Sequence, residues 1–171
     1  MDEQRQTEVF DRWLESHRGL LFKVVRAYAA APQDQEDLFQ EIAFQVWDSI
    51  PNFQWNSAET TWIYRVALYS AIAWSKREKK HSERSQALDG VEHTLLAKPE
   101  TRDGRLDWLY GQIRELDEID RSLTLLLLDG FSYKEMAATL GISESNVWVK
   151  INRIKKRLAQ RTANGGTRNG L

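Results

Sequence analysis

The chain of 171 residues contains no cysteine, three histidines and three prolines. Without cysteine it can form neither disulfides nor thiolate metal sites, and its scattered histidines have no metal-ligand spacing. No apolar run reaches the roughly 20 residues of a membrane-spanning helix, and the polar, acidic N-terminus does not resemble a signal peptide. We therefore expect a soluble, cytoplasmic protein that does not insert into membranes.

The charges of the chain are distributed in blocks. Its 24 basic and 25 acidic residues nearly cancel. However, residues 61–80 hold five basic side chains and one acidic side chain, and residues 148–171 hold seven basic side chains and no acidic one. Each basic block follows an acidic one. This pattern indicates two contacts with nucleic acid and a further partner that is not nucleic acid.

Apolar residues recur with helical rather than alternating spacing, so we expect an all-α fold of two small helical domains. Pro32 and Pro51 separate the first three helices, and Asp34 is placed to cap the second one. The expected helices cover residues 7–30, 34–50 and 60–80, and resume at residue 106. The expected domains are 1–80 and 104–161, with a flexible polar linker at 81–103 and a disordered tail at 162–171.

The clearest local pattern is a helix-turn-helix. Ser132 and Glu135 form a capping box, which starts a helix. Gly141 stands where that helix must end in a left-handed turn, and Ser143 can cap a second helix that runs to about Arg161. The apolar stripe of the second helix is Val147, Ile151, Ile154 and Leu158. A preceding stripe, Leu106, Leu109, Ile113 and Leu116, would pack on the apolar run 123–128.

The second helix of this motif carries the C-terminal basic block. A helix-turn-helix can have a purely structural role. Basic residues at the end of a helix can likewise be solvent-exposed side chains that only interact favourably with the helix dipole. The charge makes phosphate binding the better interpretation, because neutralised phosphates release counterions and supply affinity. Two helices joined by a short turn also present the start of the second helix to a DNA major groove.

The helix expected over residues 34–50 has two different faces. Leu38, Ile42 and Val46 recur at helical spacing and can supply the core. The opposite side combines carboxylates and amides with two large aromatic residues, a mixture typical of protein interfaces. Its members are Asp37, Gln40, Glu41, Phe44, Trp47 and Asp48. The alternative for either aromatic residue is packing on the first helix.

Aromatic and basic residues are interleaved over residues 53–80. Aromatic rings can stack on unpaired bases while cations follow the phosphate backbone, so this segment suits single-stranded DNA, and an unpaired base can be held in a protein pocket. The aromatic residues are Phe53, Trp55, Trp62, Tyr64, Tyr69 and Trp74, and the basic end is Lys76, Arg77, Lys79 and Lys80. An alternative stays open, because a helical stripe that could be core is formed by Trp62, Val66, Tyr69 and Ala73.

These residues resemble an extracytoplasmic-function (ECF, group IV) sigma factor of bacterial RNA polymerase. Residues 37–47 resemble the region 2 helix that docks on the β′ clamp helices. Phe53 and residues 61–67 resemble the loop and helix that read and open the −10 element. Residues 128–137 and 141–147 resemble region 4, whose second helix inserts at the −35 element.

The resemblance covers about residues 8–160 and implies partners and three groups of site residues. The partners are core RNA polymerase (β′ clamp helices and β), promoter DNA as duplex and as melted non-template strand, and an anti-sigma factor. The polymerase-binding group is Asp37, Gln40, Glu41, Phe44, Trp47 and Asp48. The −10 group is Phe53, Trp55, Asn56, Ser57, Thr61, Trp62, Arg65, Tyr69, Lys76, Arg77 and Lys80. The −35 group is Ser145, Asn146, Trp148, Val149, Lys150, Asn152, Arg153, Lys155, Lys156 and Arg157. Because the polymerase performs the chemistry, no catalytic residue, cofactor or metal is expected.

Two pairs of residues depart from the family pattern. Leu68 and Tyr69 stand where the family usually has Arg and Asn, so a phenol replaces an amide often used near the −10 strand. Trp148 and Val149 replace a small polar or basic pair, and they could contact thymine methyl groups or pack within the protein. These departures bear on the promoter sequence rather than on the general function.

Two rival functions use part of the same pattern. A regulator that binds duplex DNA without polymerase explains the helix-turn-helix but neither the 37–48 face nor the 61–80 basic block. A helical hydrolase would need a carboxylate metal site, but no histidine lies nearby, and the chain has no Walker-type glycine loop or nucleophile–base motif. The candidate carboxylates for that site are Asp34, Glu36, Asp37 and Glu41.

Overall fold

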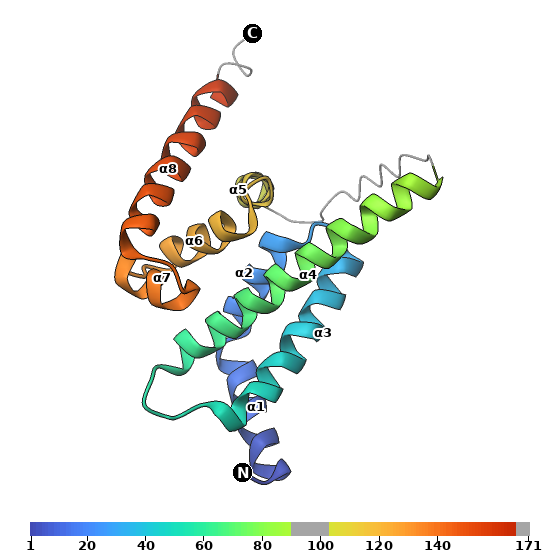
Figure 1. The fold of residues 1–171 in the computed structure, drawn as a ribbon, viewed down its shortest axis with the longest axis vertical. Helices are drawn as coiled ribbons and strands as arrows, with labels where there is room; N and C mark the ends of the chain where they lie inside the picture. The colour runs from blue at the N-terminus through green and yellow to red at the C-terminus, as the bar shows by residue number, and fades with distance from the viewer. Residues whose placement is uncertain (90–102, 167–171) are drawn as a thin grey trace. The chain divides into compact units, whose positions relative to one another are not determined.

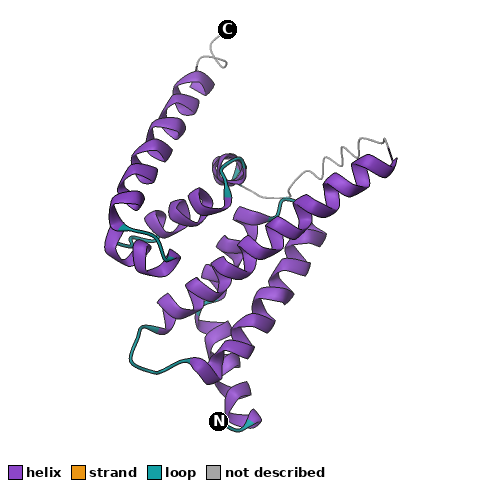
Figure 2. Ribbon diagram, viewed as in Figure 1, coloured by secondary structure: helices purple, strands orange, loops and turns teal. Residues whose placement is uncertain are grey.

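The computed structural model describes residues 1–89 and 103–166 (Figure 1). All regular structure in these residues is helical, as Figure 2 shows, which confirms the expected all-α fold class. The chain divides into two compact units, Met1–Arg114 and Glu115–Leu171. Within the described residues, no helix is both long and apolar enough to cross a membrane.

The first unit is built around α3 and α4, which pack along each other and are both contacted by α2. Its helices are α1 Glu3–Ser16, α2 Arg18–Tyr28, α3 Pro32–Ser49, the 3₁₀ turn η1 Ile50–Asn52, α4 Glu59–Asp89 and α5 Gly104–Arg114. The predicted core stripe of α3, Leu38, Ile42 and Val46, is almost completely buried, and α4 adds Ile63 and Leu68. Burial of each such aliphatic side chain contributes about 1.5–3 kcal/mol.

The first predicted helix is in fact two helices, because the chain leaves helical geometry at His17 (φ −115°, ψ 16°). The single helix expected over residues 7–30 is therefore wrong. The ring of His17 contacts the carbonyl oxygen of Trp13 at 3.1 Å and the hydroxyl of Thr60, in α4, at 3.1 Å. The break thus coincides with a contact between helices, which the periodicity of one segment cannot reveal.

The second helix begins at Pro32 with Ala31 as its N-cap, and no side chain caps it. The expected cap, Asp34, lies inside the first turn instead. Proline suits the first helical position because it has no N–H to satisfy and its φ is already helical. The turn before α3 is held by Gln35, whose Nε2 donates to the carbonyl oxygen of Ala29 at 3.0 Å.

Two helices extend beyond their expected ends. α4 continues to Asp89, so residues 81–89 are helical rather than part of a linker. This polar segment contains Glu, Arg, Gln, Ala and Leu, which all have high intrinsic helix propensity. α8 continues to Gly166, so residues 162–166 are helical rather than part of a tail. The rest of the expected linker and tail, 90–102 and 167–171, lies outside the described residues.

The second unit contains α6 Glu118–Leu128, α7 Tyr133–Leu140 and α8 Glu144–Gly166. The capping box of Ser132 and Glu135 is complete, and Gly141 ends α7 in the left-handed conformation (φ 66°, ψ 34°). Ser143 Oγ accepts a hydrogen bond from the backbone N–H of Asn146 at 3.1 Å. The helix-turn-helix is therefore confirmed with its predicted caps.

The core of the second unit follows the predicted stripes. Val147, Ile151 and Ile154 of α8 are at most 2% exposed, and Leu158 is half-buried. Most of the apolar run of α6 is also buried, although its last residue, Leu128, is 59% exposed. One face of α8 is thus buried in the core, and the opposite face is exposed.

The helix α5 packs within the first unit, whereas the sequence placed residues 104–114 with the helix-turn-helix. The guanidinium of Arg26, on α2, forms an ion pair with Asp107 at 3.1 Å and lies 4.3 Å from the ring centroid of Tyr110. Arg114 also donates to the carbonyl oxygen of Arg26 at 2.7 Å. By its contacts α5 therefore belongs to the first compact unit, because a stripe in one helix does not specify which neighbour it packs on. The domain bounds 1–80 and 104–161 stay a prediction.

Candidate functional site

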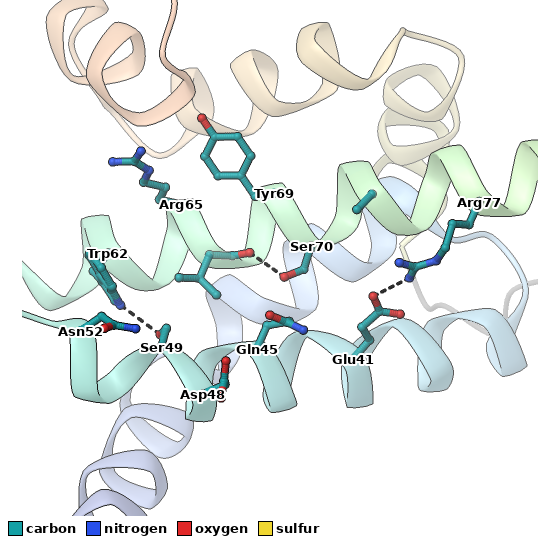
Figure 3. Close-up of a pocket in the computed structure, with 12 residues that line it drawn as sticks. Glu41, Gln45, Asp48, Ser49, Asn52, Trp62, Arg65, Tyr69, Ser70 and Arg77 are labelled. Atoms are coloured by element: carbon teal, nitrogen blue, oxygen red, sulfur yellow. Dashed lines mark hydrogen bonds and ion pairs between the residues drawn. The ribbon is translucent and has the colours of Figure 1, made fainter. Parts of the chain in front are cut away.

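A groove of about 600 Å³ lies between α3 and α4 in the first unit (Figure 3). The Trp62 indole N–H donates to Ser49 Oγ at 3.0 Å, and Arg77 forms an ion pair with Glu41. These contacts join the two helices at separate places along the groove. The α4 side of the groove is lined by the stripe that the sequence left open as core or surface: Trp62, Val66, Tyr69 and Ala73. Tyr69 and Ala73 are exposed, whereas Trp62 and Val66 are half-buried.

Three of the six aromatic residues in the interleaved segment 53–80 are buried. Tyr64 and Trp74 of α4 are 0% and 9% exposed, and Phe53, which follows η1, is 4% exposed. The ring of Phe53 lies edge-on to Trp13 at 5.2 Å and 5.6 Å from Trp62. This burial disfavours the direct DNA contact predicted for Phe53, which instead supports the loop that follows it.

That loop presents Trp55 at the surface. Its backbone has a φ of 58°, a left-handed conformation that costs roughly 1–2 kcal/mol in residues other than glycine. Its indole is 49% exposed, lies 5.0 Å from the ring of Phe53, and has the Arg12 guanidinium 5.9 Å away. Strained backbone of this kind is found at functional sites. The adjacent members of the −10 group, Asn56 and Ser57, are exposed as well.

Tyr69 and Arg65 lie one turn apart on α4 and line the groove, with both side chains pointing away from α3 (Figure 3). Tyr69 is 42% exposed, and the guanidinium of Arg65 lies 5.6 Å from its ring centroid. Among the other predicted −10 residues, Lys76 and Lys80 are exposed and Thr61 is half-buried. One exposed aromatic ring and several exposed cations therefore lie along α4.

The residues predicted to bind polymerase divide between two faces of α3. Glu41 and Asp48 line the groove. Phe44, at 60% exposure, is the most exposed aromatic residue in the described chain, and Asp37 and Gln40 are exposed too. Packing on the first helix is therefore excluded for Phe44. The half-buried Trp47 accepts a hydrogen bond at its carbonyl oxygen from Gln6 at 2.8 Å, which joins α1 to α3.

The surface of α8 carries most of the predicted −35 residues. Trp148 and Val149 are 58% and 54% exposed, so the alternative that they pack within the protein is wrong. Asn152 is half-buried and its amide donates to the Trp148 carbonyl oxygen at 2.8 Å. The remaining exposed members are Ser145, Asn146, Arg153, Lys155, Lys156 and Arg157.

Lys150 differs from its neighbours on α8. Its ammonium lies 3.3 Å from Asp120 Oδ1, and its side chain is 20% exposed. Arg153 reaches the other oxygen of the same carboxylate at 3.4 Å and is 61% exposed. Asp120 was absent from the predicted site, because it precedes these cations by 30 or more residues and only the packing of α6 on α8 brings them together.

Two parts of the chain match separate regions of one family. Sigma-70 region 2 matches residues 13–81, and Sigma-70, region 4 matches residues 106–158. The ECF RNA polymerase sigma factor SigF of Caulobacter vibrioides is 33% identical over 141 residues, which cover 80% of this chain and 75% of SigF. The chain belongs to the ECF sigma factors of the sigma-70 family.

Other relatives agree with this sigma factor assignment. The ECF RNA polymerase sigma factor SigX of Bacillus subtilis is 25% identical over 148 residues, covering 82% of this chain and 76% of SigX. The sigma factor RpoE of Bartonella quintana, crystallised with the anti-sigma factor NepR, has the same fold with a TM-score of 0.71 at 20% identity. That match covers 90% of this chain and 96% of RpoE.

Region 2 of this sigma factor carries one surface feature that the sequence did not predict. Phe22 of α2 stacks on Phe39 of α3 with ring centroids 5.2 Å apart and an interplanar angle of 16°. The guanidinium of Arg18 lies 5.4 Å from the Phe22 ring, which is 41% exposed. Phe22 and Phe39 each follow a buried residue of the apolar stripe of their helix, Leu21 and Leu38. An aromatic residue directly beside the stripe was the sequence pattern that could have predicted this pair.

The carboxylates considered for a hydrolase do not converge in this sigma factor. Within residues 1–89 and 103–166, no group of three or more histidine, aspartate or glutamate side chains could hold a metal ion. Of the four candidates, Glu41 lines the groove beside Arg77, and Asp34 lies in the first turn of α3.

Proposed function

We propose that this sigma factor divides promoter recognition between its two units. As an ECF sigma factor, it binds core RNA polymerase and directs promoter-specific initiation at −10 and −35 elements. The polymerase synthesises the RNA, so the sigma factor itself is a regulatory, non-catalytic protein. We infer a cytoplasmic location from this role, because bacterial transcription takes place there.

The observation that carries the proposal for region 4 is the division of α8 into a buried face and an exposed face. Arg153 has donors for guanine, and the exposed apolar groups of Trp148 and Val149 suit thymine methyl groups. The cations farther along the helix, Lys155, Lys156 and Arg157, are placed to neutralise phosphates and to fix the register on the duplex. Ser145 and Asn146 lie in the first turn, where a recognition helix meets base edges.

Region 2 supplies the matching surface for a single strand. Trp55 and Tyr69 offer exposed ring faces, and each has an arginine within 6 Å of its ring centroid. Base stacking on such a ring is worth about 1–3 kcal/mol per base and tolerates different bases. We assign these two rings to the melted −10 strand, with Lys76 and Lys80 following its phosphates.

The outer face of α3 is the proposed polymerase-binding surface. Phe44 supplies an exposed aromatic anchor, and Asp37 and Gln40 supply charge and hydrogen-bonding groups on the same helix. An anchor of this kind, surrounded by polar groups, is the usual composition of an energetically important contact. The carboxylate of Asp37 favours a partner surface that is basic.

We also propose that an anti-sigma factor controls this protein. Support comes from RpoE, the similar sigma factor whose solved structure contains the anti-sigma factor NepR. A direct test is to ask whether a candidate anti-sigma factor competes with core polymerase for this chain. Simultaneous binding of both partners without loss of transcription would contradict this part of the proposal.

The deciding experiment for the main proposal is run-off transcription on fragmented genomic DNA, with purified core polymerase in the presence and absence of the protein. New transcripts that require both components are expected, and their aligned start sites would give the −10 and −35 sequences. The alternative of an independent duplex-binding regulator is not favoured, because the region 2 match has no role in it. Duplex binding without any new transcript would restore that alternative.

A further inference from the structure

Asp120 connects the core of region 4 to its proposed DNA-binding face. It lies in the first turn of α6, and its side chain is 7% exposed. Its backbone N–H donates to Asp117 Oδ1 at 2.9 Å, and its carbonyl oxygen accepts from Thr124 Oγ1 at 2.7 Å. Both the backbone N–H and the carbonyl oxygen of Asp120 are therefore held by hydrogen bonds to neighbouring side chains.

The two cations that approach Asp120 are in different surroundings. Lys150 is largely covered and lies 3.3 Å from one carboxylate oxygen, so it acts as the counter-ion that a buried carboxylate requires. Arg153 lies 3.4 Å from the other oxygen, yet its side chain is 61% exposed. A guanidinium has five N–H donors in a rigid plane. One contact with Asp120 can therefore orient the plane while most of its donors face solvent.

We propose that Asp120 is a positioning residue for promoter recognition by α8. It holds the charge of Lys150 inside the unit, away from DNA phosphates, and it orients the Arg153 guanidinium toward the major groove. This inference rests on the proposed role of α8 at the −35 element. The proposal also gives Lys150 the role of an internal counter-ion, in place of the DNA contact that the sequence predicted.

The test measures how well the holoenzyme distinguishes two duplexes. One is selected by the wild-type holoenzyme from a random DNA pool, and the other has the same composition with its −35 segment shuffled. Asp120→Asn keeps the shape of the side chain and removes its charge. We expect discrimination between the duplexes to fall about tenfold, as for a lost bidentate base contact. For the shuffled duplex, the slope of the logarithm of the binding constant against the logarithm of salt concentration should become steeper by about one unit, because Lys150 can then reach a phosphate.

Glu115→Gln is the matched control. Glu115 is an exposed residue of the same unit, paired with Arg161 at 2.5 Å, so its substitution removes the same charge without touching Asp120. It should leave discrimination between the two duplexes unchanged. Equal effects of Asp120→Asn and Glu115→Gln would overturn the proposal, because they would reflect net charge alone.

Double variants separate the two actions of Asp120. In an Arg153→Gln background, Asp120→Asn should no longer reduce discrimination, and in a Lys150→Gln background it should no longer change the salt dependence. Additive effects in both backgrounds would contradict the proposal. If Asp120→Asn alone does not fold, the paired Asp120→Asn, Lys150→Gln variant removes the unmatched charge, and it should still lose discrimination. Equal binding of both duplexes by the wild-type holoenzyme would instead overturn the role of α8 itself.

Discussion

The indole of Trp55 lies 5.0 Å from the ring of Phe53 at an interplanar angle of 67°, yet one ring is 49% exposed and the other 4%. Phe53 is buried and packs against Trp55, whose ring lies at the surface. Only Trp55 has a positive φ among the non-glycine residues described. The loop thus holds an exposed aromatic ring in a conformation that its residue type does not favour.

Trp55→Gly removes the ring that is proposed to stack on a base, and it also relieves the strain in the loop backbone. Glycine adopts the φ of 58° freely, so relief of strain offsets part of the lost ring contacts, and the free energy of unfolding should change by no more than about 1 kcal/mol. Binding of a single-stranded non-template oligonucleotide by the holoenzyme should nevertheless fall about tenfold. In contrast, Phe53→Ala should destabilise the first unit by about 3–5 kcal/mol. Normal strand binding by Trp55→Gly would contradict the stacking role.

Phe44→Ala tests the polymerase-binding face of α3. Because Phe44 is 60% exposed, its removal should leave the unfolding temperature nearly unchanged while it weakens binding to core polymerase by about 2 kcal/mol or more. The matched control is Trp148→Ala on α8, an aromatic residue 58% exposed. That variant should bind core polymerase normally and lose affinity for the −35 duplex. Equal core binding by both variants would place the interface elsewhere.

The acid response of region 4 should depend on Glu135. The backbone N–H of Ser132 donates to its carboxylate at 2.7 Å, and this bond, followed by the contact with the Ser132 hydroxyl, lowers the pKa of Glu135. A lowered folded-state pKa gives stability that is complete above the unfolded pKa, about 4.3, and is lost as the pH falls through the folded value. Wild type should therefore exceed Glu135→Gln in unfolding temperature near neutral pH, and the gap should close on acidification. A constant gap would show that the capping carboxylate is not the titrating group.

Local patterns predicted the helix-turn-helix well. Its caps at Ser132 and Ser143, its end at Gly141 and the stripe of α8 all depend on residues within a few positions of one another. The stripe Leu38, Ile42 and Val46 was predictable for the same reason. Helical spacing alone is sufficient to predict the buried residues of a helix that packs on a single core through one face.

The functional assignment of individual aromatic and charged residues needed the packing. Tyr64 and Tyr69 stand five residues apart on α4, but Tyr64 is completely buried, whereas Tyr69 is 42% exposed and lines the groove. The contact between Lys150 and Asp120 depends on how α6 meets α8. Charge counts treated Lys150 like its exposed neighbours, since composition carries no information about which cation faces inward.

Gly141→Ala tests the turn that sets the angle between α7 and α8. At φ 66°, a Cβ would meet the neighbouring carbonyl, so the left-handed conformation costs an alanine roughly 1–2 kcal/mol. Asparagine tolerates this region better than alanine, and Gly141→Asn should therefore lose less stability. The comparison is made by denaturant unfolding of the full chain, with promoter-dependent transcription as a second readout. Gly111→Ala is the control, because Gly111 lies in a helix and an added Cβ has nothing within 4 Å. This variant should raise the free energy of unfolding by about 0.5–1 kcal/mol. If Gly141→Ala were as stable as Gly141→Asn, the left-handed turn could not be what ends α7.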